Sequence, residues 1–327
     1  MPPPIVQAVH FTGESLSEEE RAEASRISKV VTGAFVKGLF HRLEPAAVAL
    51  DGDVAGAETP AAVAIQRIAA PEFERMKPKL VQLRGDTNRI KALTGLTFDS
   101  LKSAGAIRMP VIHHHLLKPT TVPKPPQVPK PQKPSKPPPP KYNRLDLNLR
   151  RLHCVDETNP EGGADSMVLG AMRIGASLNV DYTPAIVAGD YDDGDARSFG
   201  ELYFGSVSLR STTTWPKTFY WIFQLVESDS DDAEVAQGVT GAVSIVAAAF
   251  GTYFGGPAAG ALVKAIIDAL GGLLGVFIDE DIFPPYGVVI KLNSENDLGS
   301  DGIRDEHTGN ITGHGGAYRI GYRLRLV

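Results

Sequence analysis

The stretch AVSIVAAAFGTYFGGPAAGALVKAIIDALGGLLGVFI, residues 242–278, lies within a chain of 327 residues. No charged side chain occurs in 235–263, and glycines recur along the whole stretch. Its length predicts two apolar helices, each of roughly 21 residues and about 30 Å, which is close to the thickness of a bilayer core. The Gly-Gly-Pro at 255–257 predicts the turn between them, because proline suits the first position of a helix. We therefore predict an apolar helical hairpin at about 233–278.

The glycines of this hairpin are spaced for close helix contacts. Glycines four residues apart let two backbones approach, as in pairs of membrane helices, whereas glycine inside a soluble helix costs roughly 0.5–1 kcal/mol relative to alanine. Lys264 and Asp268 also stand four apart and can pair on one face. Two interpretations remain open: the hairpin enters a lipid bilayer, or it is buried against the rest of the chain or in a homo-oligomer. The candidate residues are Gly251, Gly255, Gly256, Pro257, Gly260, Lys264, Asp268, Gly271 and Gly275.

The segments on either side of the hairpin predict β-strands. TTTWPKTFYWIFQLVE, residues 212–227, is rich in aromatic and β-branched side chains, which favour a buried strand. The closing AYRIGYRLRLV, residues 317–327, alternates apolar residues with arginines, so this strand has one dry face and one wet face. Short strands separated by turn residues predict an antiparallel β-sandwich over 142–327, with the hairpin inserted in it.

The part of the chain before the sandwich has a different character. Residues 1–112 predict a helical module, in which Ser15 or Ser17 caps a first helix with an acidic first turn. Residues 118–141 hold eleven prolines, six lysines and no acid, so 113–141 is predicted to be an extended polyproline linker. The fold class is therefore α+β. We interpret the helical module as a docking element for a carrier or delivery assembly.

Charge and cysteine content narrow the function classes. Residues 142–327 carry 13 basic and 25 acidic side chains, a net charge of −12, which argues against a nucleic-acid surface. The single cysteine, Cys154, excludes an internal disulfide and fits a reducing compartment. The first residues lack a basic region followed by an apolar run, so no classical signal peptide is predicted. We expect synthesis in the cytoplasm and, if the protein is exported, a dedicated delivery system.

Acidic residues cluster at both ends of the predicted hairpin, next to Glu227 on one side and Glu280 on the other. Carboxylates on loops between strands suit Ca²⁺, which prefers hard oxygen ligands, so we predict Ca²⁺ as a candidate cofactor. The alternative is that these acids only keep an apolar insertion soluble. The candidate metal ligands are Asp229, Asp231, Asp279 and Asp281. Further acids expected near the same rim are Asp156, Glu157, Glu161 and Asp165.

With these acidic loops, residues 150–327 resemble a C2-type calcium-binding sandwich, in which acidic loops bind Ca²⁺ and approach lipid. The inserted helices depart from that pattern. The insertion itself is similar to the glycine-rich apolar hairpins of colicin-like pore formers. Both resemblances imply a lipid bilayer as the partner.

An enzyme is not predicted. His153, His307 and His314 stand near acids, but the sequence contains no nucleophile elbow, no HExxH spacing and no phosphate-binding loop. We predict a membrane-active toxin or effector whose hairpin inserts into or perturbs a bilayer. The alternative is a structural or assembly module that uses the hairpin for self-association.

Overall fold

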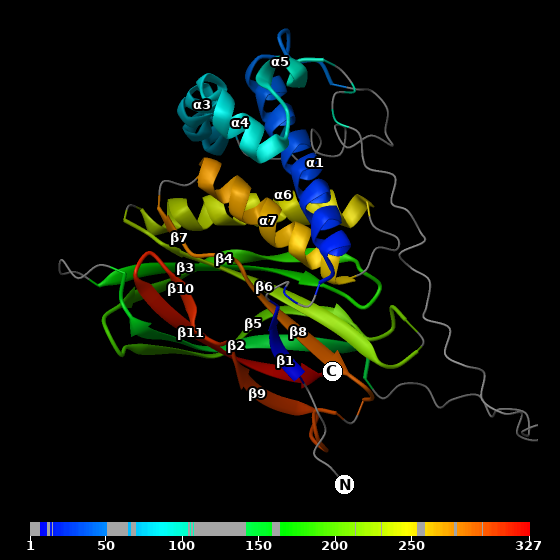
Figure 1. Cartoon of the computed structure of the whole chain (residues 1–327). Helices are drawn as coiled ribbons and strands as arrows, with labels where there is room; N and C mark the ends of the chain where they lie inside the picture. The colour runs from blue at the N-terminus through cyan, green and yellow to red at the C-terminus, as the bar shows by residue number, and fades with distance from the viewer. Residues whose placement is uncertain are drawn as a thin grey trace, which may run out of the picture.

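Two antiparallel sheets pack face to face, and helices cover the outer face of one of them (Figure 1). This computed structural model describes residues 7–11, 14, 16–50, 65–66, 70–103, 105, 107, 142–158, 164–212, 214–229, 231–253, 259–277, 280–295 and 297–327. The predicted α+β class with an antiparallel sandwich is confirmed. The predicted linker at 113–141 lies outside the described residues.

Along the chain, a first group of helices precedes most of the strands, and a second group of two helices lies between two strands. The described helices are α1 (Glu18–Leu43), α3 (Ala70–Gly85), α4 (Thr87–Thr94), α5 (Phe98–Leu101), α6 (Asp232–Tyr253) and α7 (Ala259–Phe277). The described strands are β1 (Gln7–Phe11), β2 (Arg144–Asp156), β3 (Asp165–Ile174), β4 (Val180–Tyr191), β5 (Ala196–Ser208), β6 (Lys217–Glu227), β7 (Asp281–Ile282), β8 (Tyr286–Leu292), β9 (Ile303–His307), β10 (Ile311–Gly313) and β11 (Gly316–Leu326).

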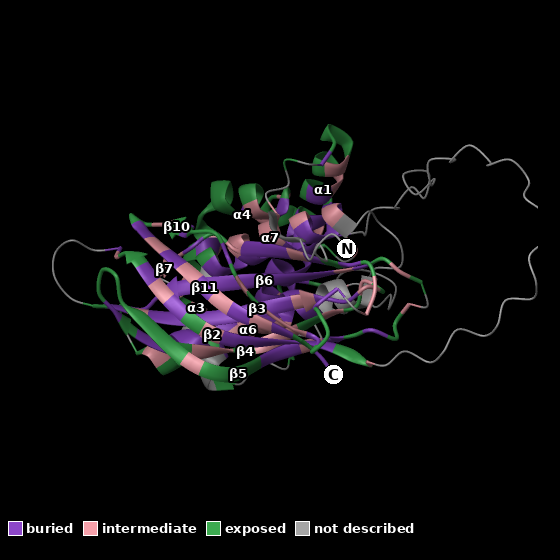
Figure 2. Ribbon diagram, turned by 90° about the horizontal axis from the view of Figure 1, so that it is seen from below, coloured by how far each residue is buried: buried purple, intermediate pink, exposed green. Residues whose placement is uncertain are grey.

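The first sheet, called sheet A, has the strand order β1-β8-β6-β3-β4, and the short β7 also pairs with β6. Its central strand β6 is buried on both faces. Phe219 and Trp221 point toward the second sheet, whereas Tyr220 and Ile222 belong to the core beneath the helices. Figure 2 shows this burial as purple along β6 and β3. A strand with two dry faces needs a nearly continuous apolar sequence, and residues 219–226 of β6 provide it, with Gln224 as the one polar residue.

The second sheet, called sheet B, has the order β10-β11-β2-β5, and β9 also pairs with β11. Tyr318, Ile320 and Tyr322 of β11 face the core between the sheets. Arg323 lies on the outer face, where its Nε donates to Asp305 Oδ1 at 2.6 Å. The predicted alternation of dry and wet positions along β11 is confirmed. The edge strand β5 is largely exposed (Figure 2).

The helices form two further layers on sheet A. Helix α6 packs on β3 and β4, and α7 contacts both α6 and α1. Buried residues of α1, α3, α4, α6, α7, β3 and β6 belong to one continuous apolar cluster. In Figure 1 the layers follow one another from α3–α5 through α1, α6 and α7 to the two sheets.

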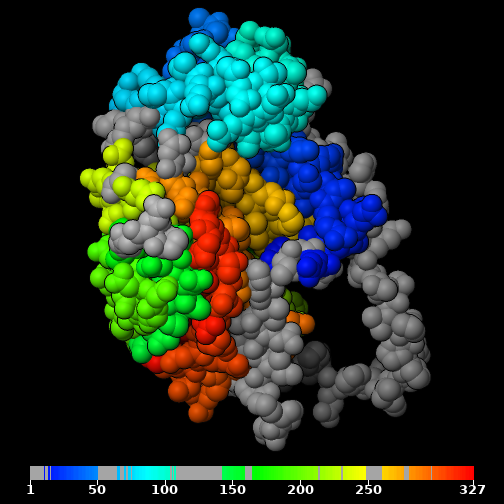
Figure 3. All heavy atoms as spheres, turned by 60° about the vertical axis from the view of Figure 1, so that its left-hand side comes forward, coloured from blue at the N-terminus to red at the C-terminus, as the bar shows by residue number. Residues whose placement is uncertain are grey.

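The N-terminal segment is built into this arrangement. Ser17 caps α1 and forms a capping box with Glu20, which confirms one of the two predicted caps. Before it, β1 pairs with β8 as an edge strand of sheet A, with Val9 opposite Val289. Figure 3 shows the blue and cyan N-terminal helices lying against the orange α7. The N-terminal helices therefore share a core with the predicted hairpin region, and docking to a carrier stays a prediction.

Candidate functional site at the base of the helical pair

Helices α6 and α7, called the helical pair below, fall in the range predicted for the hairpin. The pair lies between sheet A and the N-terminal helices. The turn at 254–258, which contains Gly255, Gly256 and Pro257, lies outside the described residues. Burial inside the chain therefore explains the apolar composition of the helical pair in this state. The fully buried residues of α7 are Leu262, Val263, Ala265, Ile266, Ala269, Leu270, Leu273 and Leu274.

Most glycines of α7 face elements outside the helical pair and not α6. A Cβ on Gly260 would lie 2.7 Å from Leu16 Cδ2, and one on Gly271 would lie 3.7 Å from Pro285 Cδ. A Cβ on Gly275 would meet no described atom within 4 Å. The missing side chain at Gly260 thus makes room for the N-terminal segment, and the missing side chain at Gly271 makes room for the 284–285 segment. At Gly275 the described neighbours leave the space open. Gly251 lies in α6.

The predicted ion pair within α7 is confirmed. Lys264 Nζ lies 2.5 Å from Asp268 Oδ1, and both side chains are about one-third exposed. The two charges therefore sit at the rim of the buried face and not inside it. No helix in the described part of the chain is both long enough and apolar enough to span a bilayer.

Both ends of the helical pair meet at one place, which we call the base. Strand β6 ends at Glu227 just before α6, and β7 follows α7 and returns to pair with β6. The ladder between β6 and β7 has two residue pairs, Val226 with Ile282 and Glu227 with Asp281. Beyond it, Asp229 N–H donates to the Glu280 carboxylate at 2.7 Å. The base is thus a short set of backbone and side-chain bonds that joins the pair to the sandwich.

His314 closes the base from the side of sheet B. It occupies the turn between β10 and β11 with a φ of 50°, in the left-handed region, and its neighbours Gly313 and Gly315 make the turn compact. Its Nδ1 lies 3.0 Å from Asp281 Oδ1, and its Nε2 lies 3.0 Å from the Ile282 carbonyl oxygen. The imidazole therefore bridges the returning strand to the second sheet.

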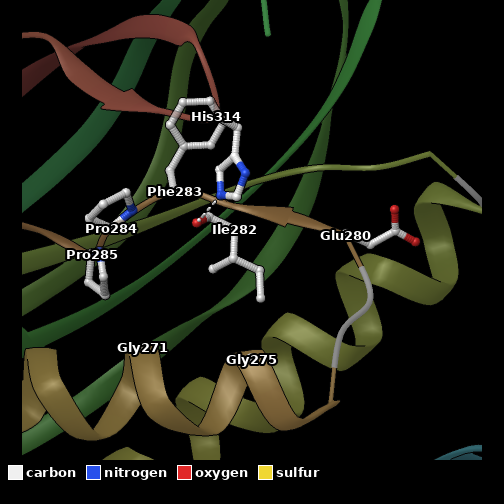
Figure 4. A pocket seen from close by; sticks show the side chains of 8 residues that line it. All are labelled: Gly271, Gly275, Glu280, Ile282, Phe283, Pro284, Pro285 and His314. Atoms are coloured by element: carbon white, nitrogen blue, oxygen red, sulfur yellow. Dashed lines mark hydrogen bonds between the residues drawn. The ribbon is translucent and has the colours of Figure 1, made fainter. Parts of the chain in front are cut away.

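An open groove of about 510 Å³ lies at the base between α7 and the returning segment (Figure 4). Gly271 and Gly275 border it on the helix side, and the Phe283 ring lies against the His314 imidazole at 6.1 Å between centroids. The small helix residues leave this space open because they present no side chain to it. Its lining is Gly271, Gly275, Glu280, Ile282, Phe283, Pro284, Pro285 and His314.

The predicted calcium ligands do not form a metal-binding group among the described residues. Asp231 Oδ1 accepts from the N–H groups of Ala233 and Glu234 at the start of α6. Asp281 pairs with His314, while Asp279 lies outside the described residues. Calcium binding at these positions stays a prediction.

The structure does bring two other acids together at the base, inside the sandwich. Asp165 at the start of β3 is 2% exposed and Glu227 at the end of β6 is 5% exposed. Thr158 connects them: its N–H donates to Asp165 Oδ2 at 2.7 Å, and its hydroxyl donates to Glu227 Oε2. The Tyr318 hydroxyl also donates to Asp165 Oδ2. These four residues, called the buried acid cluster below, come from β3, β6, β11 and the segment that follows β2.

The environment of the buried acid cluster disfavours negative charge. Burial, together with the neighbouring Asp165 carboxylate, raises the pKa of Glu227 to about 7. Burial and the hydrogen bond to Asp165 also raise the pKa of Tyr318, so its hydroxyl remains a donor. Burial raises the pKa of the nearby Cys154 thiol to about 11, so the single cysteine stays protonated at neutral pH.

The sequence placed Asp165 and Glu227 near one rim but did not single them out as a pair. They are separated by more than sixty residues, and only the alignment of β3 with β6 makes them neighbours. Comparisons with protein-family models, with curated proteins and with solved structures find no match for this chain.

Proposed function

We propose that this protein is a membrane-active toxin or effector in which the helical pair enters or perturbs a lipid bilayer. The observation that supports this best is the connection of the pair. It is inserted between two paired strands, and the β6–β7 ladder next to it is only two residue pairs long. The pair can therefore leave as a unit without disrupting the core between the two sheets, to which none of its described residues belongs.

The packing of the helical pair against its neighbours explains why the release of the pair would require a membrane. The buried face of α7 is covered by α1 on one side and α6 on another. Moving such a face into water loses its hydrophobic stabilisation, whereas moving it into an acyl-chain environment does not. In this proposal the N-terminal helices keep the pair soluble until a bilayer replaces them.

A reversible cross-link tests the proposal directly. A Cβ on Gly272 of α7 would lie 3.4 Å from Leu93 Cδ2 of α4, so Leu93→Cys combined with Gly272→Cys places two thiols together. The native Cys154 is buried and stays apart from this pair. A short, reducible thiol cross-linker would then hold α7 against α4.

We expect the wild-type chain to release dye trapped in vesicles, tested with zwitterionic and anionic lipids at neutral and acidic pH. The cross-linked variant should release none, and reduction should restore release. The two single-cysteine variants, treated with the same reagent, are the controls. Absence of release by the wild type under all conditions would refute the membrane function and leave self-association. Equal release by the locked and reduced forms would show that another element acts on the bilayer.

A further inference from the structure

The outer face of sheet B carries an open depression of about 310 Å³ over Gly321. Gly321 lies between Ile320 and Tyr322, which both face the core, so its missing side chain leaves a gap on the outer face. In the sheet it stands opposite Arg151 of β2 on one side and His307 of β9 on the other. The floor of the depression is therefore backbone, and basic side chains flank it on both sides.

An irregularity in β2 brings two neighbouring arginines to this depression. In the pairing of β2 with β11, Gly321 is opposite Arg151, and the next residue of β11 is opposite Leu149. Arg150 is therefore an extra residue on β2, and such a β-bulge sets two residues against one and re-aims a side chain. Arg150 and Arg151 both line the depression. The bulge thus gathers two positive charges at one point of the sheet.

The acids that line the depression are bound to other arginines. The Asp305 carboxylate accepts from Arg323 Nε at 2.6 Å and from Arg323 Nη2 at 2.7 Å. Glu306 pairs in the same way with Arg304. Arg151, in contrast, is exposed and forms no ion pair or side-chain hydrogen bond with any described residue. Its guanidinium is therefore available to a ligand.

Positive charge is in excess at this position, although residues 142–327 as a whole are acidic. Glu201 accepts from both Arg150 and Arg323, so one carboxylate serves two guanidinium groups. Arg319, two residues from Gly321 on β11, donates to the neutral Asn310 Oδ1 at 2.8 Å and adds a further positive charge. The charged residues that line the depression, with their ion-pair partners, are four arginines and three acids: Arg150, Arg151, Arg304, Arg323, Glu201, Asp305 and Glu306.

We propose that this depression binds an oxyanion of the phosphate class, with the Arg151 guanidinium as its main ligand and Arg150 beside it. The planar fork of an arginine presents N–H donors in the geometry that phosphate oxygens accept. The glycine floor lets the anion approach the sheet closely. His307 uses Nδ1 for the Thr308 carbonyl oxygen at 2.9 Å, which leaves Nε2 as the ring nitrogen that can meet the anion.

The site lies apart from the helical pair, because sheet B is separated from the helices by sheet A (Figure 1). The inference therefore does not rest on membrane activity. A phosphate group can belong to a small soluble molecule or to a lipid headgroup. Both sources present the same oxygens to Arg151, and the experiment distinguishes them.

Isothermal titration calorimetry of the full chain with sodium phosphate, at an ionic strength held constant with NaCl, tests the proposal. The wild type should bind phosphate saturably, and Arg151→Gln should weaken binding about tenfold or more, since it removes a charge-assisted hydrogen bond. Arg325→Gln is the matched control. It removes the same charge from an exposed residue on the same face of β11 that does not line the depression, so it should bind as the wild type does.

A second variant fills the depression without changing any charge. A Cβ on Gly321 would lie 3.5 Å from Arg151 Cβ, which is an ordinary contact, so Gly321→Val should fold. It should nevertheless lose phosphate binding, because its side chain occupies the floor. Circular dichroism checks that each variant is folded.

Two further ligands identify the source of the phosphate group. Glycerol 3-phosphate represents soluble esters, and phosphatidylcholine vesicles with and without phosphatidic acid represent the lipid headgroup. Binding of either source that Arg151→Gln weakens and Arg325→Gln retains supports the site. The inference is overturned if neither phosphate, glycerol 3-phosphate nor the vesicles with phosphatidic acid bind. It is also overturned if Arg151→Gln and Arg325→Gln weaken binding equally, which would show a diffuse effect of surface charge.

Discussion

Gly170 of β3 determines how closely α6 approaches sheet A. A Cβ at this position would lie 2.9 Å from Val239 Cγ1 and 3.5 Å from Ala185 Cβ. Val239 is fully buried on α6 and, as a β-branched residue, has little rotamer freedom to move away. The missing side chain at one residue therefore sets the spacing between the helical layer and the sheet.

We predict that Gly170→Ala lowers the free energy of unfolding by about 1–3 kcal/mol, because the added methyl group overpacks this contact. Gly275→Ala is the control on α7. Its Cβ would meet no described atom within 4 Å, and alanine favours a helix by roughly 0.5–1 kcal/mol over glycine. Urea unfolding followed by circular dichroism measures both variants. Equal effects at the two positions would contradict the close contact at Gly170.

At the scale of elements, α1 is the helix that covers the buried face of α7. Ser17 accepts a hydrogen bond from Glu20 N–H at 3.1 Å, and the Glu20 carboxylate accepts from Ser17 N–H at 2.8 Å. Three glutamates occupy the first turn, where they interact favourably with the helix dipole. These local bonds start the helix directly after Leu16, the residue that meets Gly260 of α7.

Ser17→Ala should lower the free energy of unfolding by about 1 kcal/mol, since it removes the acceptor at the N-cap. Ser17→Asp should retain most of the stability, because aspartate caps as well as serine does. Thermal unfolding of the two variants gives the comparison. If Ser17→Asp is as unstable as Ser17→Ala, the cap is not the source of the effect.

At the scale of the whole molecule, residues before and after the polyproline segment contribute to the same structure. Strand β1 pairs with β8 over five residues, and α1, α3 and α4 share an apolar cluster with α6 and α7. These contacts predict that covalent continuity through 113–141 is not needed to hold the two parts together. Hydrophobic burial across the shared cluster should be sufficient.

A specific protease site in place of 126–132 tests this expectation. After cleavage, the two fragments should elute together in native size-exclusion chromatography and separate in urea. Leu16→Asp is the comparison variant, since it would bury a charge against Gly260 and should promote separation. Separation of the unmodified fragments in native buffer would instead show that residues 1–112 are an independent module.

Sequence alone determined the features that depend on neighbours within a few residues. The aromatic run of β6, the alternation along β11, the Ser17 cap and the pairing of Lys264 with Asp268 follow from periodicity and short-range hydrogen bonding. These sequence patterns are local, so they can be recognised without knowledge of the fold. They were sufficient for the α+β class and the sandwich.

Only the tertiary structure decided which distant residues meet. Strand β1 is five residues long, and its sequence contains no feature that predicts its pairing with β8. The glycines of α7 are spaced like those of membrane helices, yet Gly260 meets Leu16 and Gly271 meets Pro285. Asp165 and Glu227 become neighbours only through the register of β3 on β6. Such contacts depend on the packing of whole layers, which the local pattern of side chains does not encode.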